Sequence, residues 1–119
     1  MIRPWLVYLP ALLWAALLLL LGSIPDVGLP RSDLPLDKAA HFLAYGVLGA
    51  LACWGWHGLR RPPLGVVLLG AIGIALADEL HQRSVPGRAA EPADVIADAA
   101  GIAAGAGLIV LVLRSRTAP

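Results

Sequence analysis

Four long apolar segments, separated by short polar turns, take up almost all of this 119-residue chain. Hydrophobic residues make up 59% of the chain, above the roughly 45–50% typical of soluble domains. A single domain of this size cannot bury so much apolar surface, so the excess must face lipid. We therefore predict an all-α, four-helix transmembrane bundle forming one domain, with helices at approximately residues 5–22, 37–57, 64–83 and 92–113.

The first apolar segment, Trp5 to Gly22, is long enough to cross a bilayer. A cleaved signal peptide is the alternative, but the segment is long for that role and no small-x-small cleavage site follows it. We expect a retained helix. Residues 23–36 hold three prolines, which predicts an irregular loop, and Asp37 is then the expected N-cap of the second helix.

Charged residues divide unequally between the two ends of such a bundle. The end with both termini and the second turn carries five arginines and no carboxylate, namely Arg3, Arg60, Arg61, Arg114 and Arg116. The other end carries four cations and all eight carboxylates. The positive-inside rule counts Lys and Arg, so we predict that the N- and C-termini are cytoplasmic. A net charge of +1 gives no electrostatic basis for binding nucleic acid.

The third apolar segment is too short to cross the bilayer without polar residues. Its charge-free part, Leu64 to Ala77, has 14 residues, which span about 21 Å against a hydrocarbon core of about 30 Å. Acidic residues that follow must therefore lie within the membrane or at its edge. Helical spacing places polar stripes on three helices at this depth, and they should meet because they cannot face lipid: Lys38, His41 and Tyr45; Asp78, Glu79 and Gln82; Asp94 and Asp98.

These residues suggest both functional and structural roles. Asp78 and Glu79 are candidate general acid/base or ligand-orienting groups, with an inter-helix salt bridge to Lys38 or Arg88 as the structural alternative. His41 is a candidate base, a metal ligand or a satisfied core histidine. No HExxH or comparable ligand spacing exists, so we predict no metal site, although a divalent cation among these carboxylates is chemically conceivable.

Two cations are candidate ligands for an anion. Arg88, after Pro86-Gly87, carries a planar guanidinium suited to phosphate or carboxylate, and an ordinary loop charge is the alternative. Lys38 is either its companion or a lysine that extends to the interface. Tyr45 and Gln82 complete the predicted binding set with Asp94 and Asp98.

Small residues recur every four positions on the fourth helix at Ala97, Gly101 and Gly105. Such a row permits close helix contact, either within the bundle, which we expect, or in a homo-oligomer. Cys53 is the single cysteine, so no intrachain disulfide can form, and we expect a buried, inert thiol.

The ordered polar motifs resemble the VanZ-like family across residues 23–105. The first half of the resemblance is Ser-x-Pro (Ser23, Pro25) followed by Asp-Lys-x-x-His-Phe-x-x-Tyr (Asp37, Lys38, His41, Phe42, Tyr45). The second half comprises Asp-Glu-x-x-Gln, Pro-x-Arg and two later residues (Asp78, Glu79, Gln82, Pro86, Arg88, Asp94, Gly101). Two positions depart from the family pattern: Glu91 replaces a Ser or Thr that would cap the fourth helix, and Asp98 replaces an Asn.

The resemblance implies a small multi-pass protein of the bacterial plasma (inner) membrane, in a family whose namesake is linked to teicoplanin-type glycopeptide resistance. We expect a cell-envelope protein whose outer-leaflet site binds an anionic lipid-linked or cell-wall precursor. A further hypothesis is that the protein also modifies the bound precursor. The resemblance assigns no mechanism and no cofactor. The alternatives are a small multidrug-type transporter, which would need an acidic residue that the first helix lacks, and a structural bundle without a site.

Overall fold

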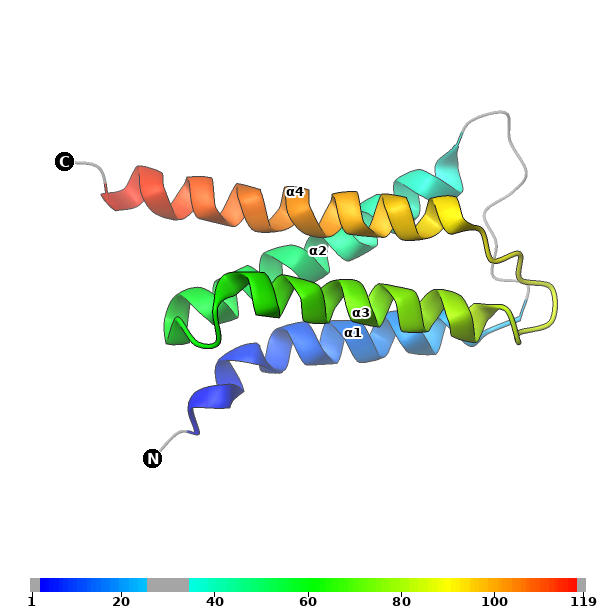
Figure 1. The fold of residues 1–119 in the computed structure, drawn as a ribbon, viewed down its shortest axis with the longest axis horizontal. Coiled ribbons are helices and arrows are strands. Elements are labelled where there is room, and N and C mark those ends of the chain that lie inside the picture. Colours follow the sequence, from blue (N-terminus) through cyan, green and yellow to red (C-terminus); the bar gives the residue numbers. More distant parts are fainter. Residues whose placement is uncertain (1–2, 26–34, 118–119) are drawn as a thin grey trace.

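The computed structural model describes residues 3–25 and 35–117, which form helices and turns and contain no strand. A 3-10 helix, η1 (Pro4–Tyr8), leads into α1 (Leu9–Gly22), followed by α2 (Leu36–Leu59), α3 (Leu64–Gln82) and α4 (Pro92–Thr117) (Figure 1). The predicted all-α, four-helix bundle is confirmed. Most of the loop predicted between the first two helices, residues 26–34, lies outside the described residues.

All four helical segments are long and apolar enough to cross a membrane, with η1 and α1 forming one of them. The fourth helix starts at Pro92 as expected, since proline needs no hydrogen-bond partner in the first turn. It extends to Thr117, beyond the predicted end. The second helix starts at Leu36, so Asp37 lies in its first turn and Pro35 occupies the N-cap position without a side-chain cap. The predicted capping role of Asp37 is therefore wrong.

Large apolar side chains are exposed on the outside of the bundle, and several polar side chains are buried inside it. Leu43, Leu69 and Ile96, on three different helices, are 67–70% exposed. In contrast, five polar side chains are at most 4% exposed, namely Asp78, Glu79, Gln82, Asp94 and Asp98. This distribution suits lipid surroundings, in which exposed leucine is favourable and exposed carboxylate is not.

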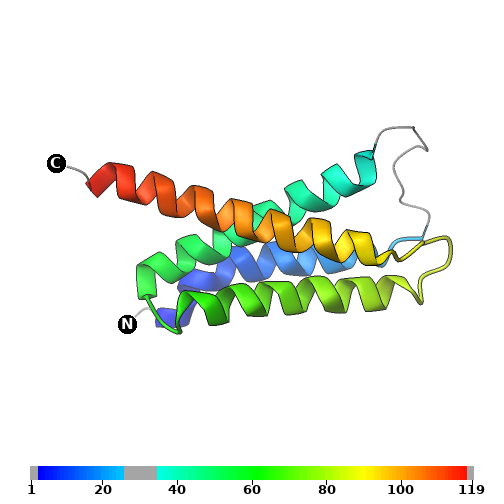
Figure 2. The ribbon, with the colours of Figure 1, turned by 45° about the horizontal axis from the view of Figure 1, so that its top comes forward.

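The closest helix pair is α2 with α4, which cross in the shape of an X (Figure 2). Backbone meets backbone at this crossing: a Cβ atom added at Gly101 or Gly105 would collide with backbone atoms of α2, and one added at Gly49 would collide with Ile102 of α4. The small-residue row on α4 is therefore used within the chain, which is the use we expected for it.

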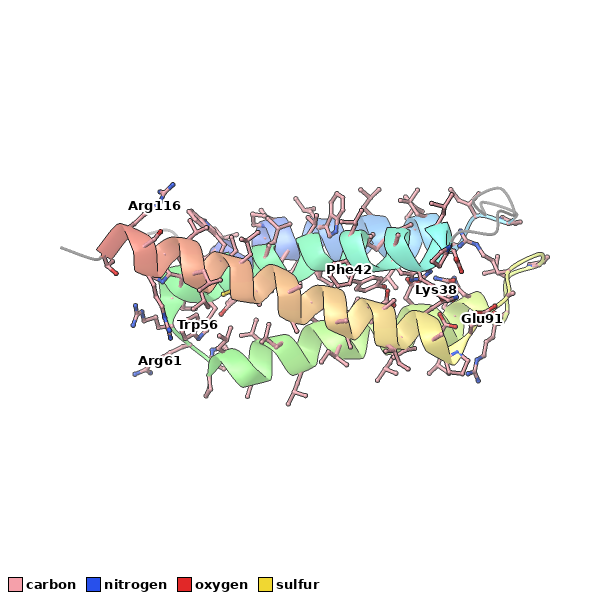
Figure 3. All side chains as sticks on the ribbon, turned by 90° about the horizontal axis from the view of Figure 1, so that it is seen from above. Lys38, Phe42, Trp56, Arg61, Glu91 and Arg116 are labelled. Atoms are coloured by element: carbon pink, nitrogen blue, oxygen red, sulfur yellow. The ribbon has the colours of Figure 1, made fainter. Side chains whose placement is uncertain are left out.

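Both termini lie at the end of the bundle that carries the α2–α3 turn (Figure 1). There the Tyr8 hydroxyl donates a hydrogen bond to the Arg61 carbonyl at 2.8 Å, which ties η1 to that turn. The α3–α4 turn lies at the opposite end. Figure 3 shows the resulting separation of charge, with Arg61 and Arg116 at one end and Lys38 and Glu91 at the other.

Candidate functional site

The three polar stripes predicted on α2, α3 and α4 do meet, at the end of the bundle that carries the α3–α4 turn. Three hydrogen-bonded pairs join them: Lys38 with Asp94, His41 with Asp98, and Tyr45 with Asp78. The first two pairs link α2 to α4, and the third links α2 to α3. Leu80 and Ile96, which neighbour these acids in sequence, are 61% and 70% exposed, as expected where lipid surrounds the site.

Lys38 lies among three carboxylates that we call the acidic triad, formed by Asp37, Glu91 and Asp94. Its Nζ atom is 2.8 Å from Asp37, 2.7 Å from Glu91 and 2.5 Å from Asp94. The triad also has the spacing of a metal site, because one oxygen from each residue lies within 4.8 Å of the others. The ammonium group of Lys38 offsets one of the three negative charges and contacts all three residues. Lys38 with the triad therefore joins the start of α2 to the start of α4.

His41 is oriented by Asp98, the residue at which the resemblance leads one to expect Asn. The Nδ1 atom is 2.8 Å from an oxygen of Asp98, whose side chain is 1% exposed. With Asp98 ionised, Nδ1 carries the proton and Nε2 is the free basic nitrogen. The His41 and Tyr45 rings are parallel, with centroids 6.5 Å apart. A carboxylate partner for a histidine is the arrangement used to hold a catalytic imidazole in one tautomer.

Asp78 receives a hydrogen bond of 2.7 Å from the Tyr45 hydroxyl. Its other oxygen is buried without a hydrogen-bond partner among the described residues. That oxygen lies against Gly22 of α1, where an added Cβ would meet both Asp78 and Gln82. The glycine at the end of α1 thus allows the first helix to reach the polar side chains of α3.

Glu79 is the least satisfied group of the site. Its residue is 3% exposed, and both carboxylate oxygens are buried without a hydrogen-bond partner among the described residues. Asp94, Asp98 and His41 lie near enough to act on it electrostatically. The backbone amide of Glu91 is also nearby but outside hydrogen-bond geometry. Such a residue costs folding free energy, so a stabilising role does not explain it.

Arg88 bonds to backbone rather than to an acid. Its Nε and Nη2 atoms donate to the carbonyls of Ile24 and Leu21, at 3.3 and 2.9 Å. Neither Arg88 nor Lys38 pairs with Asp78 or Glu79 in the described structure, so the inter-helix salt bridge considered as the structural alternative is wrong. Arg88 instead attaches the α3–α4 turn to the end of α1 and the residues just after it, where the Leu21 carbonyl also accepts a hydrogen bond from the Ile24 amide at 3.2 Å.

A cavity of about 180 Å³ lies between α1, α2 and α3 beside Arg88. Part of its wall is apolar, contributed by Leu18, Leu21 and alanines of α2. The rest is polar and comprises five of the residues predicted for the site, His41, Tyr45, Asp78, Gln82 and Arg88. Lys38, Glu79, Asp94 and Asp98 do not line this cavity but lie behind it, between α2, α3 and α4.

Sequence reasoning left His81, at this end of the bundle, outside the site. The Ser23 Oγ and His81 Nε2 atoms are 2.9 Å apart, and Ser23 also lies 2.8 Å from the Leu19 carbonyl. His81 was not among the predicted site residues, because it does not share the face of Asp78. No spacing rule predicts a contact between a residue that follows α1 and a residue of α3, 58 positions apart.

Comparison with known proteins identifies the family of the chain. No curated protein and no solved structure matches the chain significantly. The model of the VanZ/LLP1 family matches residues 5–113, which include α1, α2, α3, most of α4 and every residue of the site. The resemblance read from the polar motifs is confirmed, and the chain belongs to the VanZ/LLP1 family.

Proposed function

We propose that this protein binds an anionic, lipid-linked or cell-wall precursor in the bacterial plasma membrane, at the cavity between α1, α2 and α3. Both termini would be cytoplasmic, which follows the distribution of arginines, so that the cavity lies in the outer leaflet. The observation that carries this proposal is that one part of the cavity wall is apolar and the other part is polar. Leucines and alanines suit a hydrocarbon chain, and Arg88 beside them suits an anionic head group.

Arg88 has the donors needed for such a role. A guanidinium carries five N–H groups, and hydrogen bonds to described residues account for two of them. Because those two bonds fix the group beside the cavity, an anion could accept from the remaining N–H groups without reorganising the side chain. Lys38 is less suited to contact a ligand, because three carboxylates surround it.

His41 is the group best placed for proton transfer if the bound molecule is also modified. It lines the cavity, and Asp98 holds its Nδ1 atom. Asp78 lines the same cavity through the carboxylate that Tyr45 contacts. A contribution to glycopeptide resistance would follow if the protein changes the amount or accessibility of the precursor that the antibiotic recognises.

Binding of a phosphate-bearing lipid tests this proposal. The purified protein would be titrated in detergent with a polyprenyl phosphate and, separately, with the matching uncharged polyprenol, and complexes would be counted by native mass spectrometry. We expect preference for the phosphate, lost about tenfold in Arg88→Gln, since hydrogen bonds to charged groups contribute about 1.5–3 kcal/mol. Arg83→Gln is the matched control, because Arg83 is exposed at the same end but does not line the cavity.

Equal affinity for phosphate and alcohol would overturn the proposal, as would equal losses in the two arginine variants. In cells, an Arg88→Gln strain should lose any glycopeptide or envelope phenotype at unchanged protein level, and an Arg83→Gln strain should keep it.

A further inference from the structure

A second cavity, of about 340 Å³, lies at the opposite end of the bundle, between the end of α2, the start of α3 and the end of α4. Its polar wall consists of Trp56, His57 and Arg60 from α2 with Arg114 and Thr117 from α4. Apolar side chains of α3 and α4 complete the wall. None of these residues belongs to the site described above, and none is explained by it.

The charge around this cavity is of one sign. Arg60 and Arg114 both line it, and Arg61 and Arg116 lie at the same end (Figure 3). All carboxylates of the described residues lie instead at the end that carries the α3–α4 turn, on residues Asp37, Asp78, Glu79, Glu91, Asp94 and Asp98. Two guanidinium groups that share a cavity without a described carboxylate create a field that attracts an anion.

Donor groups at this cavity lack acceptors. The Nε1 atom of Trp56 is buried and has no hydrogen-bond partner among the described residues. The guanidinium of Arg60 lies over the Trp56 ring, 5.9 Å from the ring centroid. This contact does not use the N–H groups of Arg60, which can still donate to an acceptor beside the ring. Arg60 also ends α2 in the left-handed conformation, with φ of 53°, a conformation that a residue with a side chain rarely adopts. Trp56 and Arg60 thus both line the cavity, and neither side chain has a described acceptor for its N–H groups.

We propose that this cavity binds a phosphate group, with Arg60 and Arg114 as charged ligands and the Trp56 indole N–H as a neutral donor. The phosphate could come from the head group of an anionic lipid or from a soluble phosphate compound, since both offer the same oxygens. Basic pockets between transmembrane helices on the cytoplasmic side are typical sites for anionic head groups. The apolar wall formed by Leu64, Val110 and Leu113 gives an acyl chain a surface beside the head group.

The test compares two double variants of the full chain. Arg60→Gln/Arg114→Gln removes both charges that line the cavity, and Arg61→Gln/Arg116→Gln removes two charges from the same end that do not line it. Native mass spectrometry would measure binding of phosphatidylglycerol against phosphatidylcholine. We expect the first variant to lose preference for phosphatidylglycerol by about tenfold or more, and the second to keep it.

A second measurement uses the unmutated protein, so it does not depend on the folding of a variant. The indole N–H resonance of Trp56, assigned with Trp56→Phe, should shift when phosphatidylglycerol is added to protein in neutral detergent. The same shift with millimolar inorganic phosphate, at equal or higher affinity, would identify a soluble phosphate as the ligand. Absence of a shift with both probes, or equal losses in the two double variants, would overturn the proposal. The polyprenyl phosphate experiment with Arg88 is independent of either result.

Discussion

Glu79 allows a direct test of whether the polar cluster exists for stability or for function. Its side chain is 3% exposed, neither oxygen has a hydrogen-bond partner among the described residues, and two further carboxylates lie nearby. A buried polar group without a partner costs about 1–3 kcal/mol, and like charges add to that cost. Glu79→Gln keeps the shape of the side chain and removes its charge. We therefore expect the variant to be more stable than the parent protein, by about 1 kcal/mol.

Asp98→Asn is the matched control for this experiment. It makes the same change from acid to amide in the same cluster, but Asp98 has a partner, the Nδ1 atom of His41 at 2.8 Å. Charged hydrogen bonds contribute about 1.5–3 kcal/mol, so this variant should lose stability by about 1–2 kcal/mol. The two substitutions should thus shift the unfolding transition in opposite directions.

The measurement is unfolding of purified protein in one detergent, followed by circular dichroism at increasing denaturant concentration. If Glu79→Gln destabilises the protein as much as Asp98→Asn does, Glu79 has a structural partner and the reasoning is refuted. If Glu79→Gln is more stable but fails to support binding or a cellular phenotype, Glu79 serves the site at the expense of stability.

Two other substitutions test the packing and the ion pairs. Gly105→Ala should destabilise the protein by about 1–3 kcal/mol in the same unfolding assay, because its Cβ would collide with the Gly46 carbonyl. Gly107→Ala, with no atom within 4 Å of the added Cβ, is the control and should be neutral or stabilising. Similar losses in both variants would contradict the α2–α4 crossing. Lys38→Ala should destabilise the protein by about 2–3 kcal/mol, because the three carboxylates would lose their cation. Millimolar Ca²⁺ should restore the stability of this variant by occupying the acidic triad and should not change that of the parent protein. A variant as stable as the parent would contradict the role given to Lys38.

Much of the fold follows from the sequence because the bilayer limits the choices. Lengths of apolar runs determine the number of helices, and helical spacing determines which face of each helix is polar. The short third run predicts that Asp78 and Glu79 lie within the membrane or at its edge, and both are buried in the bundle, at 3% exposure, as acidic side chains that cannot face lipid should be. The convergence of three polar stripes follows from the same reasoning, since none of them can face lipid.

The pairing within the cluster could not be predicted in the same way. A salt bridge from Lys38 to Asp78 or Glu79 was one alternative, but Lys38 contacts Asp37 of its own helix together with Glu91 and Asp94, which lie next to and on α4. Asp37 is the nearest acid to His41 in sequence, although Asp98 is its partner. Spacing along a helix gives depth and face, but the choice between two neighbouring helices depends on how they cross. Here the crossing depends on Gly46, Gly101 and Gly105, which let the backbones of α2 and α4 touch. As a result, α2 packs more closely against α4 than against α3.

The glycine crossing of α2 and α4 lies between the two ends of each helix. Their backbones touch near Gly46 and Gly105, and both pairs of ends diverge from that point (Figure 2). Lys38 and Asp94 hold one pair of ends together, and Arg60 and Arg114 line the opening at the other. We expect a change of the crossing angle to alter both ends together. Loss of the ion pairs at the acidic end should then change the width of the cavity at the arginine end, some tens of ångströms away along helices of this length.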